Sequence, residues 1–179
     1  MYILSQILVI LSDVFCIISM FKKDKKNLLF YLIFSSTLFS VHYLCLGGWT
    51  GAVTGLIEIT FLILMYVLEK YNKTKYNIYL ILATMLITII MSILTWNTWI
   101  SILPMISMII YLLTMIFKNV IIVKIGAFIR LALNALYMLL LGSYFGAGAS
   151  IVILICTIVG IVLDVKSKKQ QSDPFTDEK

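Results

Sequence analysis

Seven apolar stretches of about 20 residues each, separated only by short turns, dominate this chain of 179 residues. An α-helix needs about 20 mostly apolar residues to cross the hydrocarbon core of a bilayer. The pattern therefore predicts an all-α integral membrane protein with seven transmembrane helices. We place these helices at residues 3–20, 27–46, 50–68, 76–95, 98–117, 122–141 and 146–165.

The composition agrees with this prediction and excludes several classes of function. Hydrophobic residues make up 62% of the chain and charged residues 12%, and the mean hydropathy is +1.08. Soluble domains are about 45–50% apolar and about 25% charged, so a soluble enzyme, a disordered regulator and a nucleic-acid-binding module are excluded. Cys16, Cys45 and Cys156 lie in or beside apolar stretches, without a C-x-x-C pair or a histidine cluster. We therefore expect no disulfide framework, no metal site and no cofactor.

Lysines occur on only one side of the predicted membrane. They follow the first, third, fifth and seventh stretches, whereas the turns at 47–49, 96–99 and 142–144 carry no charged side chain. Positively charged loops stay on the cytoplasmic side, so we expect the N-terminus outside and the C-terminus in the cytoplasm. The first stretch has no basic segment before it and no cleavage site after it, so we expect a retained span rather than a signal peptide.

A shift of 95 positions superposes two parts of the chain. It aligns the turn LGGWTGA at 46–52 with LGSYFGA at 141–147, and it places Lys23 on Lys118. We therefore predict a 3+1+3 plan, in which a linker helix joins two parallel three-helix bundles, as in known parallel-repeat transporters. The predicted units are a first bundle at 1–68, the linker helix at 69–97, a second bundle at 98–166 and a disordered cytosolic tail at 167–179.

Four glycines and one proline are assigned structural roles. Gly47 and Gly142 would permit tight turns at the ends of two helices, and Gly51 and Gly146 would let helices approach closely. The alternative for these glycines is packing alone. Pro104 lies inside the fifth stretch, where a proline would free a backbone carbonyl and kink the helix.

Four ionisable side chains stand out in the predicted spans because they lie away from the lysine-bearing ends. A charged residue at the centre of a span costs about 2.5–3.5 kcal/mol on insertion scales, so each one needs a reason. Asp13, Glu58 and Arg130 fall in the middle third of the membrane, while His42 lies nearer the outer side. One interpretation is that these four side chains line a shared binding site. The alternative is structural: Arg130 would only neutralise Glu58 or Asp13, and His42 would only fix helix packing.

The sixth span carries a polar stripe. Arg130, Asn134 and Tyr137 are spaced by four and three residues and so share one helical face. Because parallel-repeat carriers place their substrate between the two repeats, we predict a pocket there. Its expected lining is Asp13, His42, Glu58, Arg130, Asn134 and Tyr137.

Several short motifs resemble one known family. The basic loop KKDKK at 22–26, the span ending in His42-Tyr43, the Leu46-Gly47-Gly48 turn and the Gly-Ala pair that follows are similar to the YgjV family. This resemblance covers nearly the whole chain and implies a protein of the bacterial cytoplasmic (inner) membrane. The 3+1+3 plan also resembles the wider set of SWEET, PnuC and PQ-loop transporters, which implies passage of a small polar solute by alternating access. The chain lacks their Pro-Gln pair, so no binding residue is carried over from them.

The expected function is transport of a small polar or anionic solute through the pocket between the repeats. Arg130 would attract an anionic group, and an acidic side chain would bind a coupling proton or cation. The expected partners are thus the lipid bilayer and the solute, not nucleic acid, and an oligomer is left open. The alternative is a non-transporting scaffold, receptor or partner-stabilising subunit. An enzyme is not expected, because no H-E-x-x-H motif, Ser–His–acid arrangement or Gly-rich phosphate loop is present.

Overall fold

The computed structural model describes residues 2–71, 73–96 and 98–171, which form helices joined by short turns. Within these ranges there is no β-strand, and short 3-10 turns at Thr74–Tyr76 and Trp99–Ser101 precede the fourth and fifth α-helices. Each of the predicted stretches forms a helix. The helices are α1 Tyr2–Met20, α2 Lys25–Cys45, α3 Trp49–Lys70, α4 Asn77–Leu94, α5 Ile102–Met115, α6 Val120–Leu140 and α7 Tyr144–Gln171.

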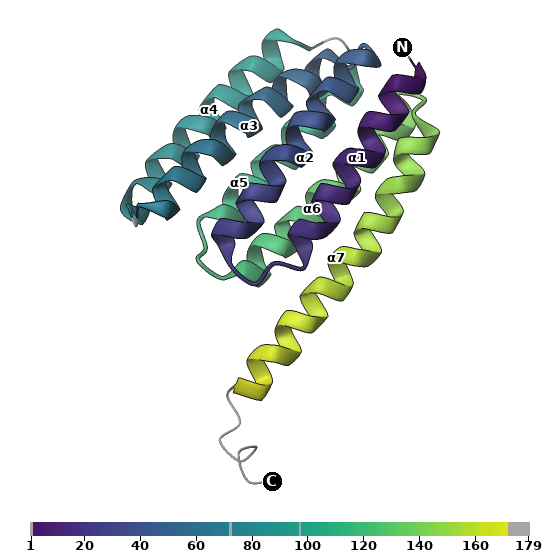
Figure 1. Ribbon diagram of the computed structural model, residues 1–179. Helices are drawn as coiled ribbons and strands as arrows, with labels where there is room; N and C mark the ends of the chain where they lie inside the picture. The colour runs from purple at the N-terminus through teal and green to yellow at the C-terminus, as the bar shows by residue number, and fades with distance from the viewer. Residues whose placement is uncertain (1, 72, 97, 172–179) are drawn as a thin grey trace.

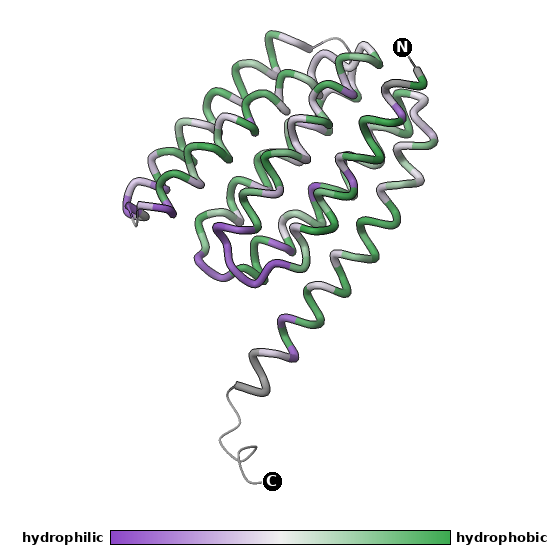
Figure 2. Tube along the Cα trace, in the orientation of Figure 1, coloured by the Kyte–Doolittle hydropathy of each residue, from purple (hydrophilic) through white to green (hydrophobic). Residues whose placement is uncertain are grey.

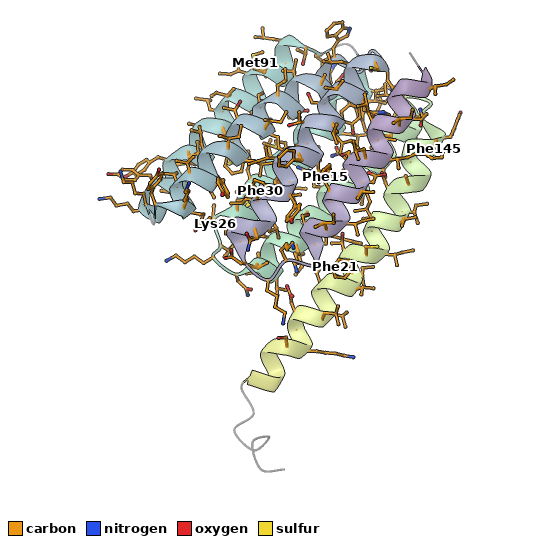
Figure 3. The ribbon with its side chains drawn as sticks, viewed as in Figure 1. Phe15, Phe21, Lys26, Phe30, Met91 and Phe145 are labelled. Atoms are coloured by element: carbon orange, nitrogen blue, oxygen red, sulfur yellow. The ribbon has the colours of Figure 1, made fainter. Side chains whose placement is uncertain are left out.

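The outer surface of these helices is suited to lipid. In the described chain, 5 helices are long and apolar enough to cross a membrane: α2, α3, α4, α6 and the first 24 residues of α7. Ser5–Met20 and Trp99–Met115 are shorter apolar helices. Large apolar side chains face outward, and Leu94 of α4 is 73% exposed. Phe15 and Phe30 also lie on an outer face in Figure 3. The prediction of a helical membrane protein is confirmed.

The helices pack largely in the order in which they occur in the chain (Figure 1). α2 lies between α1 and α3, which we call the first group, and α6 lies between α5 and α7, which we call the second group. The two groups meet because α1 contacts α7 and α3 contacts α5, while α4 packs against α3 and α5. An apolar core that includes Phe61, Met65 and Tyr111 joins both groups.

The two ends of this helical assembly differ in polarity. Figure 2 shows the hydrophilic loops that follow α1, α3 and α5 at one end, which we call the lysine end. Lys26 lies at this end, and Met91 and Phe145 lie toward the other (Figure 3). We call that opposite end the glycine end, after its turns at 46–48 and 141–143.

The two turns that name the glycine end have the same backbone geometry. Gly47 and Gly142 have φ angles of 73° and 79°, which glycine adopts without steric cost. In each turn the N–H of the following residue donates, at 2.9 Å, to the carbonyl five residues earlier. This hydrogen bond is the mark of a Schellman motif. The sequence shift that aligns the two turns therefore also aligns two identical helix ends.

Pro104 lies nearer the start of its helix than expected. α5 begins at Ile102, so Pro104 falls in the first helical turn, where an amide has no helical partner to lose. The irregularity lies just before the proline, as the 3-10 turn Trp99–Ser101. A change from 3-10 to α-helix thus lies just before the proline, and a kink at Pro104 stays a prediction.

α7 extends past the other helices at the lysine end (Figure 1). Its 28 residues rise about 42 Å, compared with about 30 Å for the hydrocarbon core of a bilayer. The sequence predicted a disordered tail from residue 167, but the helix continues to Gln171. Residues 172–179, the rest of that predicted tail, lie outside the described residues.

Candidate functional site

An ion pair lies at the centre of the structure, between α3 and α6. Glu58 of α3 and Arg130 of α6 are only 8% and 5% exposed, and the guanidinium contacts the carboxylate through Nη1 and Oε1. The sequence left open whether Arg130 pairs with Glu58 or with Asp13, and the structure pairs it with Glu58. Because α3 and α6 belong to different groups of helices, this ion pair joins the two groups.

Two further side chains hold this central ion pair. Ser36 of α2 donates a hydrogen bond to Glu58 Oε1 at 2.9 Å. The ring of Tyr111 on α5 lies 4.7 Å from the Arg130 guanidinium, within the range of a cation–π interaction. Four helices therefore contribute to one buried cluster. Sequence reasoning missed Ser36 and Tyr111, because a serine or tyrosine in an apolar span gives no spacing signal for a contact with another helix.

A small cavity lies beside the central ion pair. It has a volume of about 20 Å³, and Glu58, Arg130 and Asn134 are among its lining residues. Ser107 of α5 also lines it and donates to Asn134 Oδ1 at 3.1 Å. A cavity needs roughly 10–15 Å³ to hold one water molecule. In this conformation the central cavity therefore has room for about one water and none for an organic solute.

Asp13 and His42 are buried but do not line the central cavity. Asp13 of α1 is 6% exposed, and neither of its oxygens has a hydrogen-bond partner in the described part of the chain. The Gln6 amide on α1 also lacks a partner there. His42 Nδ1 lies 2.9 Å from the Ser5 carbonyl oxygen, which can only accept, and 2.8 Å from Ser5 Oγ. His42 is therefore held by α1 through Ser5.

Tyr137 packs against Tyr43 on the glycine-end side of the central cavity. The two ring centroids are 5.5 Å apart, and the rings meet edge to face. Tyr43 lines the central cavity, whereas Tyr137 lines a second cavity of about 40 Å³, together with Gly48, Thr50 and Ser101. The tyrosine pair therefore lies between the two cavities.

Gly51 and Gly146 lie where neighbouring side chains come close to the backbone. A Cβ atom on Gly51 would be 2.8 Å from Tyr137 Cε1 and 3.1 Å from Tyr43 Cγ. A Cβ atom on Gly146 would be 2.8 Å from Met138 Sδ. Contacts this short require a neighbour to move, so Gly51 in particular preserves the position of the tyrosine pair.

Two more ion pairs lie toward the lysine end. Lys25 of α2 pairs with Glu69 of α3 at 3.1 Å and donates to the Met115 carbonyl of α5 at 3.3 Å. Lys124 of α6 is fully buried and pairs with Asp164 of α7 at 2.7 Å. The sequence pattern indicates only a topology signal at these lysines. The available clue was that Glu69 and Asp164 also lie 95 positions apart.

The cysteines and the candidate metal ligands do not cluster in the described ranges. There, no three histidine, cysteine or acidic side chains come together as metal ligands. Cys16, Cys45 and Cys156 are free thiols.

One protein family matches nearly the whole chain. The sequence model of the Imp-YgjV family, described as bacterial inner membrane protein, matches residues 3–168. The chain belongs to the YgjV family. Neither curated proteins nor solved structures gave a match. The resemblance found in the sequence is thus confirmed. This YgjV-family chain is a bacterial inner membrane protein whose apolar helices contact the lipid bilayer.

Proposed function

We propose that this YgjV-family chain carries a small polar solute across the inner membrane by alternating access. The proposal is supported chiefly by the Arg130–Glu58 ion pair, which lies beside a polar cavity and links the two groups of helices. Ionisable groups at membrane depth are expensive and mark pathways for solutes, ions or protons. Parallel-repeat carriers bind substrate near the midplane, between their repeats. The central cavity has the corresponding position between α2, α3, α5 and α6.

The proposed mechanism follows the 3+1+3 plan, with α4 as the linker between the two groups. At the glycine end, contact between Tyr43 and Tyr137 closes the path to the central cavity. At the lysine end, Lys25 closes it, because it binds Glu69 of its own group and the Met115 carbonyl of the other. Rocking of one group against the other would open one closure while the other stays shut.

The ion pair also suggests how a solute would bind. Glu58 already neutralises Arg130, so an anionic solute must replace the carboxylate. Uptake of a proton by Glu58 would release the guanidinium for the anionic group of the solute. A proton and an anionic solute would therefore bind together, with Ser107 and Asn134 as neutral hydrogen-bonding groups. A neutral polar solute would bind beside the intact pair.

The proposed orientation puts the lysine end in the cytoplasm, by the positive-inside rule. A reporter enzyme that is active only outside the cytoplasm should be inactive when fused after residue 179. The same reporter should be active when inserted in the turn at 141–143. The opposite pattern would reverse the orientation and leave the fold unchanged.

Uptake into liposomes tests the proposed function. Liposomes containing the purified chain are given labelled sugars, amino acids, nucleosides and organic acids in parallel. We expect one class to enter faster than into empty liposomes, and Arg130→Ala and Glu58→Gln to abolish this uptake. Gly148→Ala is the control, because beyond its own stretch of helix no atom lies within 4 Å of the added methyl group. Uptake of none of the classes, or full uptake by folded Glu58→Gln protein, would contradict the proposal.

A second candidate is a non-transporting scaffold or partner-stabilising subunit. The closed interior favours it, because the central cavity holds about one water and large side chains such as Phe61, Met65 and Tyr111 fill the core. In that case the central ion pair only fixes helix packing. Glu58→Gln would then lower stability, no solute would enter liposomes, and a partner protein would co-purify with the chain.

A further inference from the structure

A cavity much larger than the central one lies at the lysine end, away from the central ion pair. It has a volume of about 350 Å³ and lies between the loop after α1, the start of α6 and the C-terminal part of α7. Small-molecule sites typically have volumes of about 300–1,000 Å³. This lysine-end cavity is therefore large enough for a ligand without any rearrangement, unlike the central cavity.

Two lysines from different loops line the lysine-end cavity. Lys23 follows α1 and Lys118 follows α5, and they are aligned by the sequence shift of 95 positions. Lys23 Nζ donates to Ser167 Oγ at 3.1 Å, which holds the first loop against α7. Among the described residues neither lysine has an acidic partner. Both positive charges are thus available to an anion.

Among the described residues that line this cavity, the one acidic residue does not cancel those charges. Asp164 accepts a hydrogen bond from the fully buried Lys124 at 2.7 Å. A carboxylate held at that distance by an ammonium group is already neutralised. Lys23 and Lys118 therefore leave an excess of positive charge in the cavity.

The start of α6 adds to this attraction. Val120 and Ile121, its first residues, line the cavity, and the N-terminal end of a helix carries a partial positive charge. The Asn119 side chain accepts from the Ile121 N–H at 3.1 Å, so this backbone N–H is not offered to an anion. The attraction from the start of α6 therefore comes from the helix dipole. The helix dipole adds to the attraction that the two lysines exert on an anion.

We propose that the lysine-end cavity binds a phosphate group. Lysine is a common ligand of phosphate and acts as a point charge, and basic pockets between transmembrane helices bind the head groups of anionic lipids. The ends of the helices are where lipid phosphates lie, and inorganic phosphate offers the same chemistry from solution. Bound there, the phosphate bridges the loops that follow α1 and α5 and so ties the first group of helices to the second. This site does not depend on the proposed transport function.

Binding to the full chain in detergent tests the site. The probes are short-chain phosphatidylglycerol, inorganic phosphate, and diacylglycerol with the same acyl chains, which has no phosphate. The readouts are the dissociation constant and the rise in Tm on binding. We expect Lys23→Gln/Lys118→Gln to weaken binding roughly 25-fold, about fivefold for each lysine. Lys73→Gln/Lys75→Gln is the matched control, because it removes the same charge from the loop after α3, outside this cavity.

Each outcome decides the proposal. Binding of phosphatidylglycerol alone identifies the occupant as a lipid phosphate, and binding of inorganic phosphate identifies a free one. Either result supports the site if Lys23→Gln/Lys118→Gln weakens binding and the control Lys73→Gln/Lys75→Gln does not. Equal effects of diacylglycerol, equal losses of affinity in both double variants, or no binding of either phosphate probe overturns the proposal. If the double variant does not fold, Lys118→Gln alone should weaken binding about fivefold.

Discussion

Arg130 and Glu58 join two different groups of helices at the centre of the structure, whereas Lys124 and Asp164 join the neighbouring helices α6 and α7 near the lysine end. The central pair lies beside a cavity of about 20 Å³, and the end pair lies beside one of about 350 Å³. More water can therefore reach a broken pair at the lysine end than at the centre, where the cavity has room for about one molecule. Both ion pairs are buried, so burial does not predict which one is costlier to break. The difference lies in which helices each pair joins and in how much water can reach it.

The largest effect should come from breaking the central pair on one side. Glu58→Gln leaves the buried Arg130 charge unpaired, and we expect it to lower the free energy of unfolding by about 3–5 kcal/mol. Glu58→Gln/Arg130→Met removes both charges and should recover most of the loss. Chemical unfolding in detergent measures both values. If the double variant is no more stable than Glu58→Gln, the unpaired Arg130 charge is not the cause of the lost stability.

Breaking the end pair should cost less. Lys124→Met leaves Asp164 without its partner but next to the lysine-end cavity, and we expect a loss of about 2–3 kcal/mol. Asp164→Asn should cost a similar amount, because Lys124 then remains buried without an acid. The same unfolding measurement applies. A loss greater than that of Glu58→Gln would contradict the comparison between centre and end.

A smaller loss of stability is expected when the hydrogen bond from Ser36 to the central ion pair is removed. Ser36→Ala removes the hydrogen bond to Glu58 Oε1, and a bond to a charged group contributes about 1.5 kcal/mol at the lower end of its range. Thr37→Ala is the control, because Thr37 is exposed and its hydroxyl binds the Ile33 carbonyl of its own helix. Equal stability of Ser36→Ala and Thr37→Ala would show that Ser36 does not support the ion pair.

The smallest effect is expected for Lys25. Glu69, its acidic partner, is 18% exposed at the side chain and also accepts from Asn77 Nδ2 at 3.2 Å. Lys25→Gln therefore leaves Glu69 partly satisfied, and we expect a loss of about 1 kcal/mol or less. In the transport assay the same variant should alter uptake more than stability, because Lys25 also bridges to Met115. A folded Lys25→Gln protein with unchanged uptake would remove Lys25 from the proposed closure.

Most of the helices could be predicted because their physical signals are local. An apolar stretch long enough to cross a bilayer is visible in the sequence, and so is the glycine that ends a helix, as at Gly47 and Gly142. The start of α5 was misjudged because its 3-10 turn is as apolar as the helix that follows. Hydropathy does not distinguish a 3-10 turn from an α-helix.

The sequence could identify candidate residues of the central site but not which of them form the ion pair. Helical spacing puts Arg130 and Asn134 on one face, and depth puts Asp13 and Glu58 at a similar level. The choice of Glu58 depends on how α1, α3 and α6 are rotated against one another, which no single-helix pattern contains. Lys124 was missed for a related reason: a lysine near a helix end normally extends toward water, but this one turns inward to Asp164.

The length of α7 has a mechanical consequence. Its last turns continue beyond the rest of the bundle as a stiff rod, and transmembrane helices tilt by about 20° on average. Such a rod acts as a lever arm, because a slight change of tilt within the bilayer becomes a larger sideways displacement at its tip. A spin label or a small domain attached directly after Gln171 would report any change in the tilt of α7 as a displacement at the membrane surface.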